Sequence, residues 1–236
     1  MIYADPPFFT GATQRSSPAA ARRHRTADAS YADSWPSVDG YIGWLRERIE
    51  ATAPALKPTG LILIHCDWHA CHHIRLMLEE LFGVSGFVNH LIWSYGLGGS
   101  SPRRFARKHD DILVYAADSR RAYFDPPMVP ATSARMKGKL KKATDVIDIP
   151  SLNNMAAERS GYPTQKPLQL LSLLIRAFCP PGGTVLDPCF GSGTTLLAAK
   201  ETGRLGIGCD VNPQAVRICR ERLSERETGP TPARLG

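Results

Sequence analysis

Residues 184–195 read Thr-Val-Leu-Asp-Pro-Cys-Phe-Gly-Ser-Gly-Thr-Thr, and this stretch decides the fold class of the 236-residue chain. A short β-rich run, a glycine turn and the start of a helical pattern follow one another directly. Glycines at such a turn let the backbone approach a ligand, and the helix N-terminus favours polar or anionic groups. A second β-rich run ends at Asp210, 19 residues after Gly191, where nucleoside-binding folds place a ribose-binding carboxylate. The stretch therefore predicts a nucleoside site in an α/β fold.

The residues after the turn discriminate among nucleoside cofactors. A phosphate-binding P-loop needs Gly-Lys-Ser/Thr, whereas Thr194 and Thr195 follow Gly193 here. The NAD fingerprint requires a third glycine where this chain has Leu196. We therefore favour S-adenosylmethionine, against the alternative of a glycine turn that binds nothing. The candidate cofactor-binding residues of this stretch are Asp187, Phe190, Gly191, Ser192, Gly193, Thr194 and Asp210.

The rest of the chain alternates β-rich runs with helical patterns, which is typical of βαβ units around a mostly parallel sheet. The predicted strands are Met1–Ala4, Gly60–His65, His90–Tyr95, Ile112–Ala116, Thr184–Leu186 and Leu205–Cys209. Asp67 and Asn212 are predicted to N-cap helices, and Pro167 suits the first turn of another. This order predicts a doubly covered α/β sheet.

Two stretches depart from the alternation within the single domain expected for residues 1–236. Residues 10–30 are rich in Ala, Ser and Gly and predict a mobile loop. Residues 118–162 are irregular and basic and predict an insertion. The net charge of +7 is also concentrated, because residues 100–142 hold eleven Lys or Arg against four Asp or Glu. A basic surplus confined to one segment favours a polyanionic partner.

The composition excludes several classes of protein. The 43% hydrophobic and 22% charged residues are typical of a globular chain rather than a disordered one. No apolar run approaches the roughly 20 residues of a membrane span. A β-rich run follows Met1 at once, so we expect no signal peptide. The six cysteines form no CxxC pair, which predicts reduced thiols in a cytoplasmic protein.

A dense group of His and Cys residues is a candidate metal site, since zinc prefers these ligands. Its members are His65, Cys66, Asp67, His69, Cys71, His72 and His73. They alternate across a predicted strand end and helix start, and no second Cys/His pair lies elsewhere in the sequence. We interpret the group as a helix N-terminus with partly buried cysteines and exposed histidines, and we expect no metal ion. Cys189, beside the glycine turn, is interpreted as a packing residue rather than a nucleophile.

Asp5-Pro6-Pro7-Phe8 follows a predicted strand directly, where open α/β sheets place their sites. The Asp5 carboxylate and the Pro6 carbonyl can accept hydrogen bonds from an exocyclic amino group, and Phe8 offers a face for stacking a base. The prolines fix φ and make the turn rigid. Accidental composition is the alternative, since Asp125-Pro126-Pro127-Met128 is a second copy, although no regular strand precedes it. We predict that Asp5, Pro6, Pro7 and Phe8 are catalytic residues.

Together these motifs resemble those of the amino-methyltransferases of DNA, in the permuted β class, where the Asp-Pro-Pro-aromatic motif precedes the cofactor motif. The resemblance covers nearly the whole chain and includes Thr164-Gln165-Lys166-Pro167. It implies a Rossmann-like, mostly parallel seven-stranded sheet with helices on both faces and circularly permuted motif order. It also implies target recognition by residues 118–162 and binding of the cofactor's methionine carboxylate by Lys166.

The function that the resemblance implies is methyl transfer from S-adenosylmethionine to N6 of an adenine flipped out of the duplex. An aspartate at the first motif position goes with adenine in this family. The alternatives are an N4-cytosine or RNA adenine methyltransferase, or an inactive DNA-binding member. The implied partner is double-stranded DNA, and a homodimer and a cognate restriction endonuclease are further candidates, in the bacterial cytoplasm at the nucleoid. The candidate DNA-binding residues are Arg103, Arg104, Arg107, Lys108, Arg135, Lys137, Lys139, Lys141 and Lys142.

Overall fold

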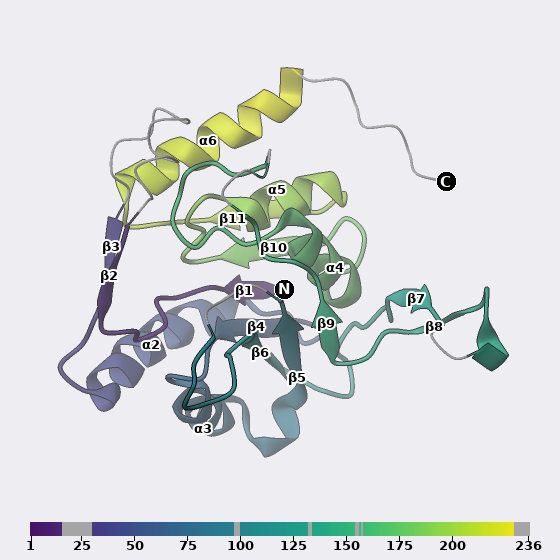
Figure 1. The fold of residues 1–236 in the computed structure, drawn as a ribbon, viewed down its shortest axis with the longest axis horizontal. Coiled ribbons are helices and arrows are strands. Elements are labelled where there is room, and N and C mark those ends of the chain that lie inside the picture. Colours follow the sequence, from purple (N-terminus) through teal and green to yellow (C-terminus); the bar gives the residue numbers. More distant parts are fainter. Residues whose placement is uncertain (16–29, 97–99, 132–133, 154–155, 157, 229–236) are drawn as a thin grey trace.

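The computed structural model describes residues 1–15, 30–96, 100–131, 134–153, 156 and 158–228. Its centre is a seven-stranded sheet with the order β11-β10-β1-β4-β6-β5-β9 (Figure 1). The strands are β1 (Ile2–Ala4), β4 (Leu61–Cys66), β5 (Phe87–Ser94), β6 (His109–Ala116), β9 (Val146–Asp148), β10 (Thr184–Asp187) and β11 (Leu205–Gly208). Strand β6 runs antiparallel to β4 and β5, and the other described pairings of this sheet are parallel. The predicted mostly parallel sheet is confirmed.

Helices cover both faces of this sheet (Figure 1). One face carries α2 (Val38–Thr52) and α3 (Cys71–Phe82). The other carries α4 (Leu168–Phe178) and α5 (Thr194–Glu201), with α6 (Pro213–Thr228) beside α5. Short 3₁₀ helices in the described part of the chain are η1 (Ala53–Ala55), η2 (Val84–Gly86) and η3 (Ala134–Met136). No described helix has the length and hydrophobicity that crossing a bilayer requires.

The composition of β4 explains how the sheet supports a core on each face. All six of its residues are buried. Leu61 and Leu63 belong to the core that includes α4 and α5, whereas Ile62 and Ile64 belong to the core that includes α2 and α3. A strand covered on both faces needs apolar residues at every position, because successive side chains point to opposite sides.

Two small antiparallel ladders lie outside the main sheet. Strand β2 (Ala12–Arg15) pairs with β3 (Ser30–Asp33), and β7 (Met128–Pro130) pairs with β8 (Leu140–Lys142). The prediction of a mobile loop over residues 10–30 is therefore wrong at its ends. Its centre, with Arg22, Arg23 and Arg25, lies outside the described residues. The predicted insertion 118–162 also contains β9, which belongs to the central sheet.

The predicted helix starts have different outcomes. Asn212 is confirmed, since its side-chain oxygen accepts the backbone N–H of Gln214 at 2.9 Å. Asp67 is not an N-cap, because α3 begins at Cys71 after Ala70. The Asp67 carboxylate instead accepts the backbone N–H of His69, only two residues away, at 2.9 Å. The Asp67 carboxylate therefore stabilises a turn that precedes α3 and does not cap the helix.

Candidate active site

The carboxyl ends of the parallel strands place acidic residues along one edge of the sheet. Asp5 follows β1, Asp187 ends β10 and Asp210 lies two residues beyond β11. Strand β6 runs the other way, so Asp110, near its start, also lies at this edge. Sites in open α/β sheets form where such strand ends meet. The sheet thus brings together carboxylates that are far apart in the sequence.

A cavity of about 580 Å³ lies at this edge. That volume is typical of sites for small molecules and cofactors. Predicted site residues that line it are Asp5, Pro6, Pro7, Lys166, Asp187, Phe190, Gly191, Ser192, Thr194 and Asp210. Phe8 and Gly193, which were also predicted, are not among its lining residues. The structure therefore joins the two principal motifs of the sequence in one cavity.

The glycine turn after β10 has a backbone that side chains would disrupt. Gly191 and Gly193 have φ values of +52° and +76°. A Cβ on Gly193 would collide with the side chain of Cys219, and a Cβ on Gly191 would lie 3.1 Å from the ring of Tyr162. Gly193 therefore shapes the turn by its packing, whereas Gly191 forms part of the cavity wall.

Asp210 fixes the turn from the neighbouring strand. Its Oδ2 accepts the backbone N–H of Gly191 at 2.9 Å, and its Oδ1 accepts that of Asn212 at 2.8 Å. Each carboxylate oxygen has a second lone pair that can accept a further hydrogen bond. Asp210 can therefore hold the turn and accept hydrogen bonds from ligand hydroxyl groups at the same time.

Asp187 is buried at the end of β10, and Cys189, two residues beyond it, is partly buried and lines the cavity. Burial raises the pKa of Asp187 to about 7, although its Oδ1 accepts the backbone N–H of Cys189 at 3.0 Å. Burial also raises the pKa of the Cys189 thiol well above its ordinary value. A thiol that stays protonated is a poor nucleophile. This supports the interpretation of Cys189 as a packing residue.

An ion pair joins the catalytic motif to the segment before α4. Lys166 Nζ lies 2.8 Å from each carboxylate oxygen of Asp5. Both side chains are largely buried, and the ammonium group also lies 4.8 Å from the ring centre of Phe8. The sequence separates Asp5 and Lys166 by 161 residues, and no local pattern predicts their contact. The residue expected to hold a cofactor thus contacts the carboxylate predicted to be catalytic.

The loop after Pro7 is held by two residues that the sequence did not single out. Buried Asp33 accepts the backbone N–H of Phe9 and the hydroxyl of Thr10, both at 2.6 Å. The Tyr41 hydroxyl donates to the carbonyl of Pro7 at 2.7 Å. Phe9 has a φ of +63°, which costs energy for a residue with a side chain. These contacts offset that cost and fix the exit of the catalytic motif.

Phe8 stacks on His65, with ring centres 5.7 Å apart and an angle of 24° between the rings. His65 is fully buried, so the expectation of an exposed histidine is wrong at this position. Its Nδ1 lies 2.8 Å from the Tyr3 hydroxyl and its Nε2 lies 3.1 Å from Asp110 Oδ2. The structure separates His65 from His72 and His73, which are exposed on α3 as expected.

The Asp110 carboxyl is stabilised in its charged form. Burial by itself would raise its pKa, but the hydrogen bond and charge of His65, together with Lys166, bring the pKa below its ordinary value. The Tyr95 hydroxyl also donates to Asp110 Oδ1 at 3.2 Å. Asp110, His65 and Phe8 therefore form a chain of contacts that reaches the predicted catalytic motif, and no local pattern in the sequence indicates it.

The predicted DNA-binding residues fall into two separate groups. The first occupies the connection from β5 to β6, which lies at the same edge of the sheet as the cavity. Arg103, Arg104 and Arg107 are exposed there, and the guanidinium of Arg107 lies 3.4 Å from the ring centre of Trp68. Lys108 Nζ donates to the carbonyl of Gly96 at 2.9 Å. This group borders the catalytic edge.

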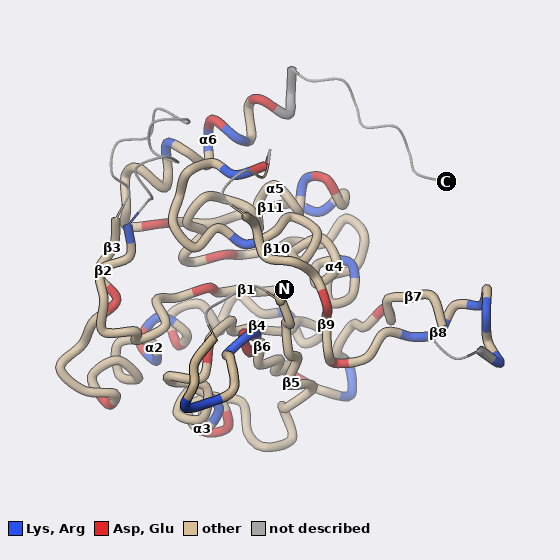
Figure 2. The backbone as a smooth tube through the Cα atoms, viewed as in Figure 1, with Lys and Arg blue, Asp and Glu red and all other residues tan. Residues whose placement is uncertain are grey.

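The second group lies on an arm formed by β7, β8 and their connection. The arm follows Ala116, which pairs with Leu61 at the opposite end of β4 from the catalytic edge. Figures 1 and 2 show the arm projecting from the body of the molecule, with Lys and Arg along it. Its predicted members are Arg135, Lys137, Lys139, Lys141 and Lys142. The structure therefore does not bring the two basic groups together.

Comparison with known proteins agrees with the fold and with the motifs. A family model described as "DNA methylase" (N6_N4_Mtase) matches residues 1–221. The type II methyltransferase M2.DpnII of Streptococcus pneumoniae is 30% identical, covering 97% of this chain and 84% of the relative. The DNA adenine methyltransferase YhdJ of Escherichia coli K12 is 27% identical, covering 94% of this chain and 75% of the relative. The crystal structure of an M1.HpyAVI–SAM complex superimposes with a TM-score of 0.63 at 24% identity, covering 94% of this chain and 87% of that one.

Proposed function

The chain belongs to the DNA methylase family, and we propose that it transfers a methyl group from S-adenosylmethionine to N6 of an adenine in double-stranded DNA. The observation that carries this proposal is that Asp5 and the glycine turn after β10 line one cavity. The aspartate at the start of the catalytic motif and the similarity to a DNA adenine methyltransferase favour adenine over cytosine.

The residues of the cavity fit S-adenosylmethionine. A Cβ at Gly208 would lie 2.7 Å from the carbonyl oxygen of Asp187, so glycine allows β11 to pack closely against the end of β10 beside the cavity. Asp210 would accept the ribose hydroxyls, and Phe190, Ser192 and the backbone of 191–194 would contact the nucleoside. Lys166 can reach the methionine carboxylate. When bound, the cofactor supplies a methyl group activated by its sulfonium.

The contacts of Asp5 indicate how this chain handles the target amino group. Each Asp5 oxygen lies 2.8 Å from Lys166 and still has a lone pair free to accept an N–H bond. Asp5 and the Pro6 carbonyl would orient the amino group and polarise its N–H bonds. Lys166 fixes the direction of the carboxylate. Rate enhancement of this kind comes from positioning and electrostatics.

The base must leave the duplex to reach a cavity of this kind, at a cost of a few kcal/mol. Phe8 is supported from behind by His65, and we propose that it stacks on the flipped base. No covalent intermediate with the enzyme is needed, because the amino nitrogen would take the methyl group directly from the sulfonium, and the amino proton that it loses would pass to solvent water.

Asp5→Ala tests the proposal. We expect methylation of DNA to fall below a few per cent of wild type. Affinity for S-adenosylmethionine should change by less than about tenfold, because Asp5 lies outside the glycine turn that is proposed to bind the nucleoside. The measurements are transfer of labelled methyl to DNA and calorimetric titration with the cofactor.

Analysis of the product nucleosides then identifies the acceptor. N6-methyladenine supports the proposal, and N4-methylcytosine or methylated RNA would replace it with the corresponding activity. A wild-type protein that binds DNA but methylates none would make the chain an inactive member of the family. Retention of activity by Asp5→Ala would remove Asp5 from the mechanism.

We also propose that DNA contacts both basic groups, with the loop 100–108 close to the target base and the arm on flanking phosphates. Phosphate contacts release counterions, so log affinity falls with log salt at about −0.9 per phosphate. The triple variant of Lys137, Lys139 and Lys141 to Gln should make this slope shallower by about 1–3 units without changing cofactor affinity. An unchanged slope would leave DNA binding to the loop 100–108.

The biological setting remains a proposal built on the same chemistry. A DNA substrate favours a cytoplasmic protein associated with the bacterial nucleoid. Residues 118–162 are proposed to recognise the target sequence. Because this region is small, a homodimer would double the surface that recognises DNA. A cognate restriction endonuclease would cleave the same site when it is unmethylated. Sequencing of modified bases in cells that express the chain would identify the recognised sequence.

A further inference from the structure

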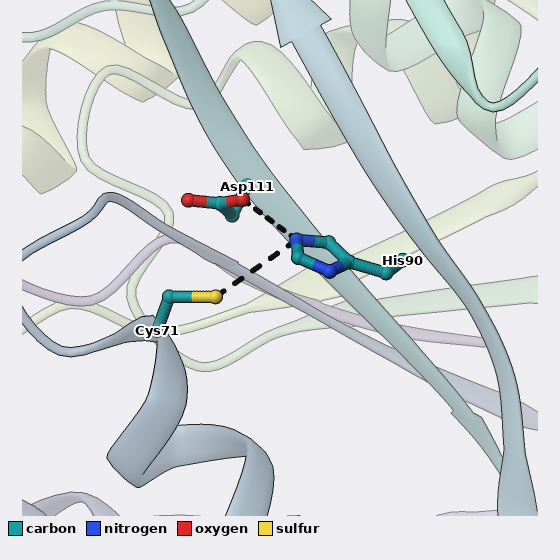
Figure 3. A group of neighbouring side chains, drawn as sticks. All are labelled: Cys71, His90 and Asp111. Atoms are coloured by element: carbon teal, nitrogen blue, oxygen red, sulfur yellow. Dashed lines mark hydrogen bonds and ion pairs between the residues drawn. The ribbon is translucent and has the colours of Figure 1, made fainter.

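Cys71, His90 and Asp111 form a cluster on the face of the sheet that α2 and α3 cover (Figure 3). They come from the start of α3, from β5 and from β6. His90 Nε2 lies 2.6 Å from Asp111 Oδ1 and 3.9 Å from Cys71 Sγ. The ligand atoms of Cys71, His90 and Asp111 all lie within 4.8 Å of one another.

The contacts of the His90 ring are unusual for a hydrogen-bonded histidine. Figure 3 shows that the carboxylate and the thiol approach the same ring nitrogen. One ring nitrogen has one position in the ring plane, which holds either a hydrogen or a lone pair. A hydrogen there bonds to Asp111 at 2.6 Å, and a shared bond to Cys71 at 3.9 Å would be weak. A metal ion in the same position would contact all three ligand atoms.

The surroundings of the cluster also suit a cation. Asp111 and Cys71 are 5% and 4% exposed, so neither is well solvated. In the described part of the chain, the Asp111 carboxylate has a hydrogen bond with the side chain of His90. A buried carboxylate is costly without a positive partner. The His90 side chain is 33% exposed, which gives a route from solvent to the cluster.

Cys66 supplies a fourth donor of the same kind. It pairs with Asp111 across the β4–β6 ladder and is 1% exposed. Two thiols, an imidazole and a carboxylate are ligands that Zn²⁺ binds in tetrahedral geometry. Zinc–ligand bonds of about 2.0–2.3 Å put neighbouring ligand atoms roughly 3.3–3.8 Å apart. The ligand atoms of Cys71, His90 and Asp111 lie within 4.8 Å of one another, so shifts of about 1 Å would bring these three to one ion, and the Cys66 side chain would move toward it as the fourth ligand.

We propose that Cys71, His90 and Asp111, with Cys66 as the fourth ligand, bind a Zn²⁺ ion. The ion would link the start of α3 to three strands of the sheet. A site with four protein ligands has no open position for a substrate and is structural. It also lies on the face opposite His65 and Asp110, so its role is to stabilise the scaffold and not to transfer methyl groups.

Metal titration of the full-length protein tests this site. The protein is stripped with a chelator, incubated with Zn²⁺ and desalted, and its zinc is measured by atomic emission. We expect about one Zn²⁺ per chain, a higher melting temperature with zinc, and a visible absorption band typical of tetrahedral thiolate ligation when Co²⁺ replaces Zn²⁺. Absence of bound zinc and of the Co²⁺ band would overturn the proposal.

Matched variants locate the ion. Cys71→Ser and His90→Gln should weaken Zn²⁺ binding by at least about tenfold and abolish the rise in melting temperature. His72→Ala, on the exposed face of the same helix, should bind zinc like wild type. His90 is partly exposed, so His90→Gln remains informative even where Cys71→Ser fails to fold. Wild-type zinc binding by His90→Gln would contradict the assignment.

Discussion

The sheet carries two His–Asp pairs on opposite faces, and their surroundings differ. His65 and Asp110 face the core beneath α4, where both ring nitrogens of His65 have separate partners. His90 and Asp111 face the side of α2 and α3, where one ring nitrogen is approached by both Asp111 and Cys71. The same residue types thus make a closed hydrogen-bonded pair on one face and a candidate ligand set on the other.

Aromatic packing separates the pairs further. The His65 ring makes edge contacts with Tyr3 and Trp93 at 6.2 and 5.6 Å between ring centres, and it stacks on Phe8. His90 has no such described ring contact and is one-third exposed. Enclosure lets His65 support Phe8 rigidly, whereas the exposed His90 ring could be reached by an ion from solvent.

The largest effect is expected from removal of the His65 ring. His65→Ala takes away the surface on which Phe8 stacks, and a misplaced catalytic group can cost about a hundredfold in rate. We expect methylation to fall by about that factor, measured as kcat at saturating DNA and cofactor. His65→Phe keeps the stacking surface but not the hydrogen bonds, and it should recover part of the rate. Equal losses in both variants would argue against support by stacking.

A smaller difference should separate the two aspartates. Asp110→Ala leaves the buried Nε2 of His65 without a partner, which costs about 1–3 kcal/mol of unfolding free energy. Asp111→Ala in metal-free protein should cost less, because the His90 ring can reach water. Urea unfolding of both variants in the presence of a chelator measures this difference in unfolding free energy. A greater loss in Asp111→Ala would reverse the comparison.

The pH dependence of stability should show the pairing of Asp110. Its pKa in the folded protein lies below the ordinary value of about 3.9, so its contribution is present above that pH and is lost as the pH falls through the folded pKa. Wild type should therefore lose stability relative to Asp110→Asn as the pH is lowered below about 4. Thermal unfolding at a series of acidic pH values, without ligands, measures this. Parallel curves would mean that Asp110 titrates normally.

Asp187 provides the opposite case. Burial raises its pKa to about 7, so the folded protein retains a proton that the unfolded chain releases near pH 4. Stability should decrease as the pH rises from about 4 through about 7, and Asp187→Asn should remove that decrease. Melting temperatures of the ligand-free proteins at pH 5 and pH 8 test this, and a wild-type curve that matches the variant would contradict it.

Local sequence predicted those parts of the site that depend on strand ends. Asp5, Asp187 and Asp210 each come directly after a β-rich run, so their meeting at one edge follows from a parallel sheet. The glycine turn was predictable for the same reason. The contact of Lys166 with Asp5 and the clamp of Asp33 on the loop after Pro7 were not, because they join segments whose separation in sequence gives no periodic signal.

The sequence by itself determined that neighbouring residues of the predicted strand, such as Ile64 and His65, point to opposite faces of the sheet, since side chains alternate along any strand. It could not determine which strand lies beside them. Tertiary structure placed antiparallel β6 next to β4, and its register set Asp111 opposite Cys66 and Ile112 opposite His65. That register depends on burying apolar residues on both faces at once, which is a property of the whole packed sheet. The two His–Asp pairs are its consequence.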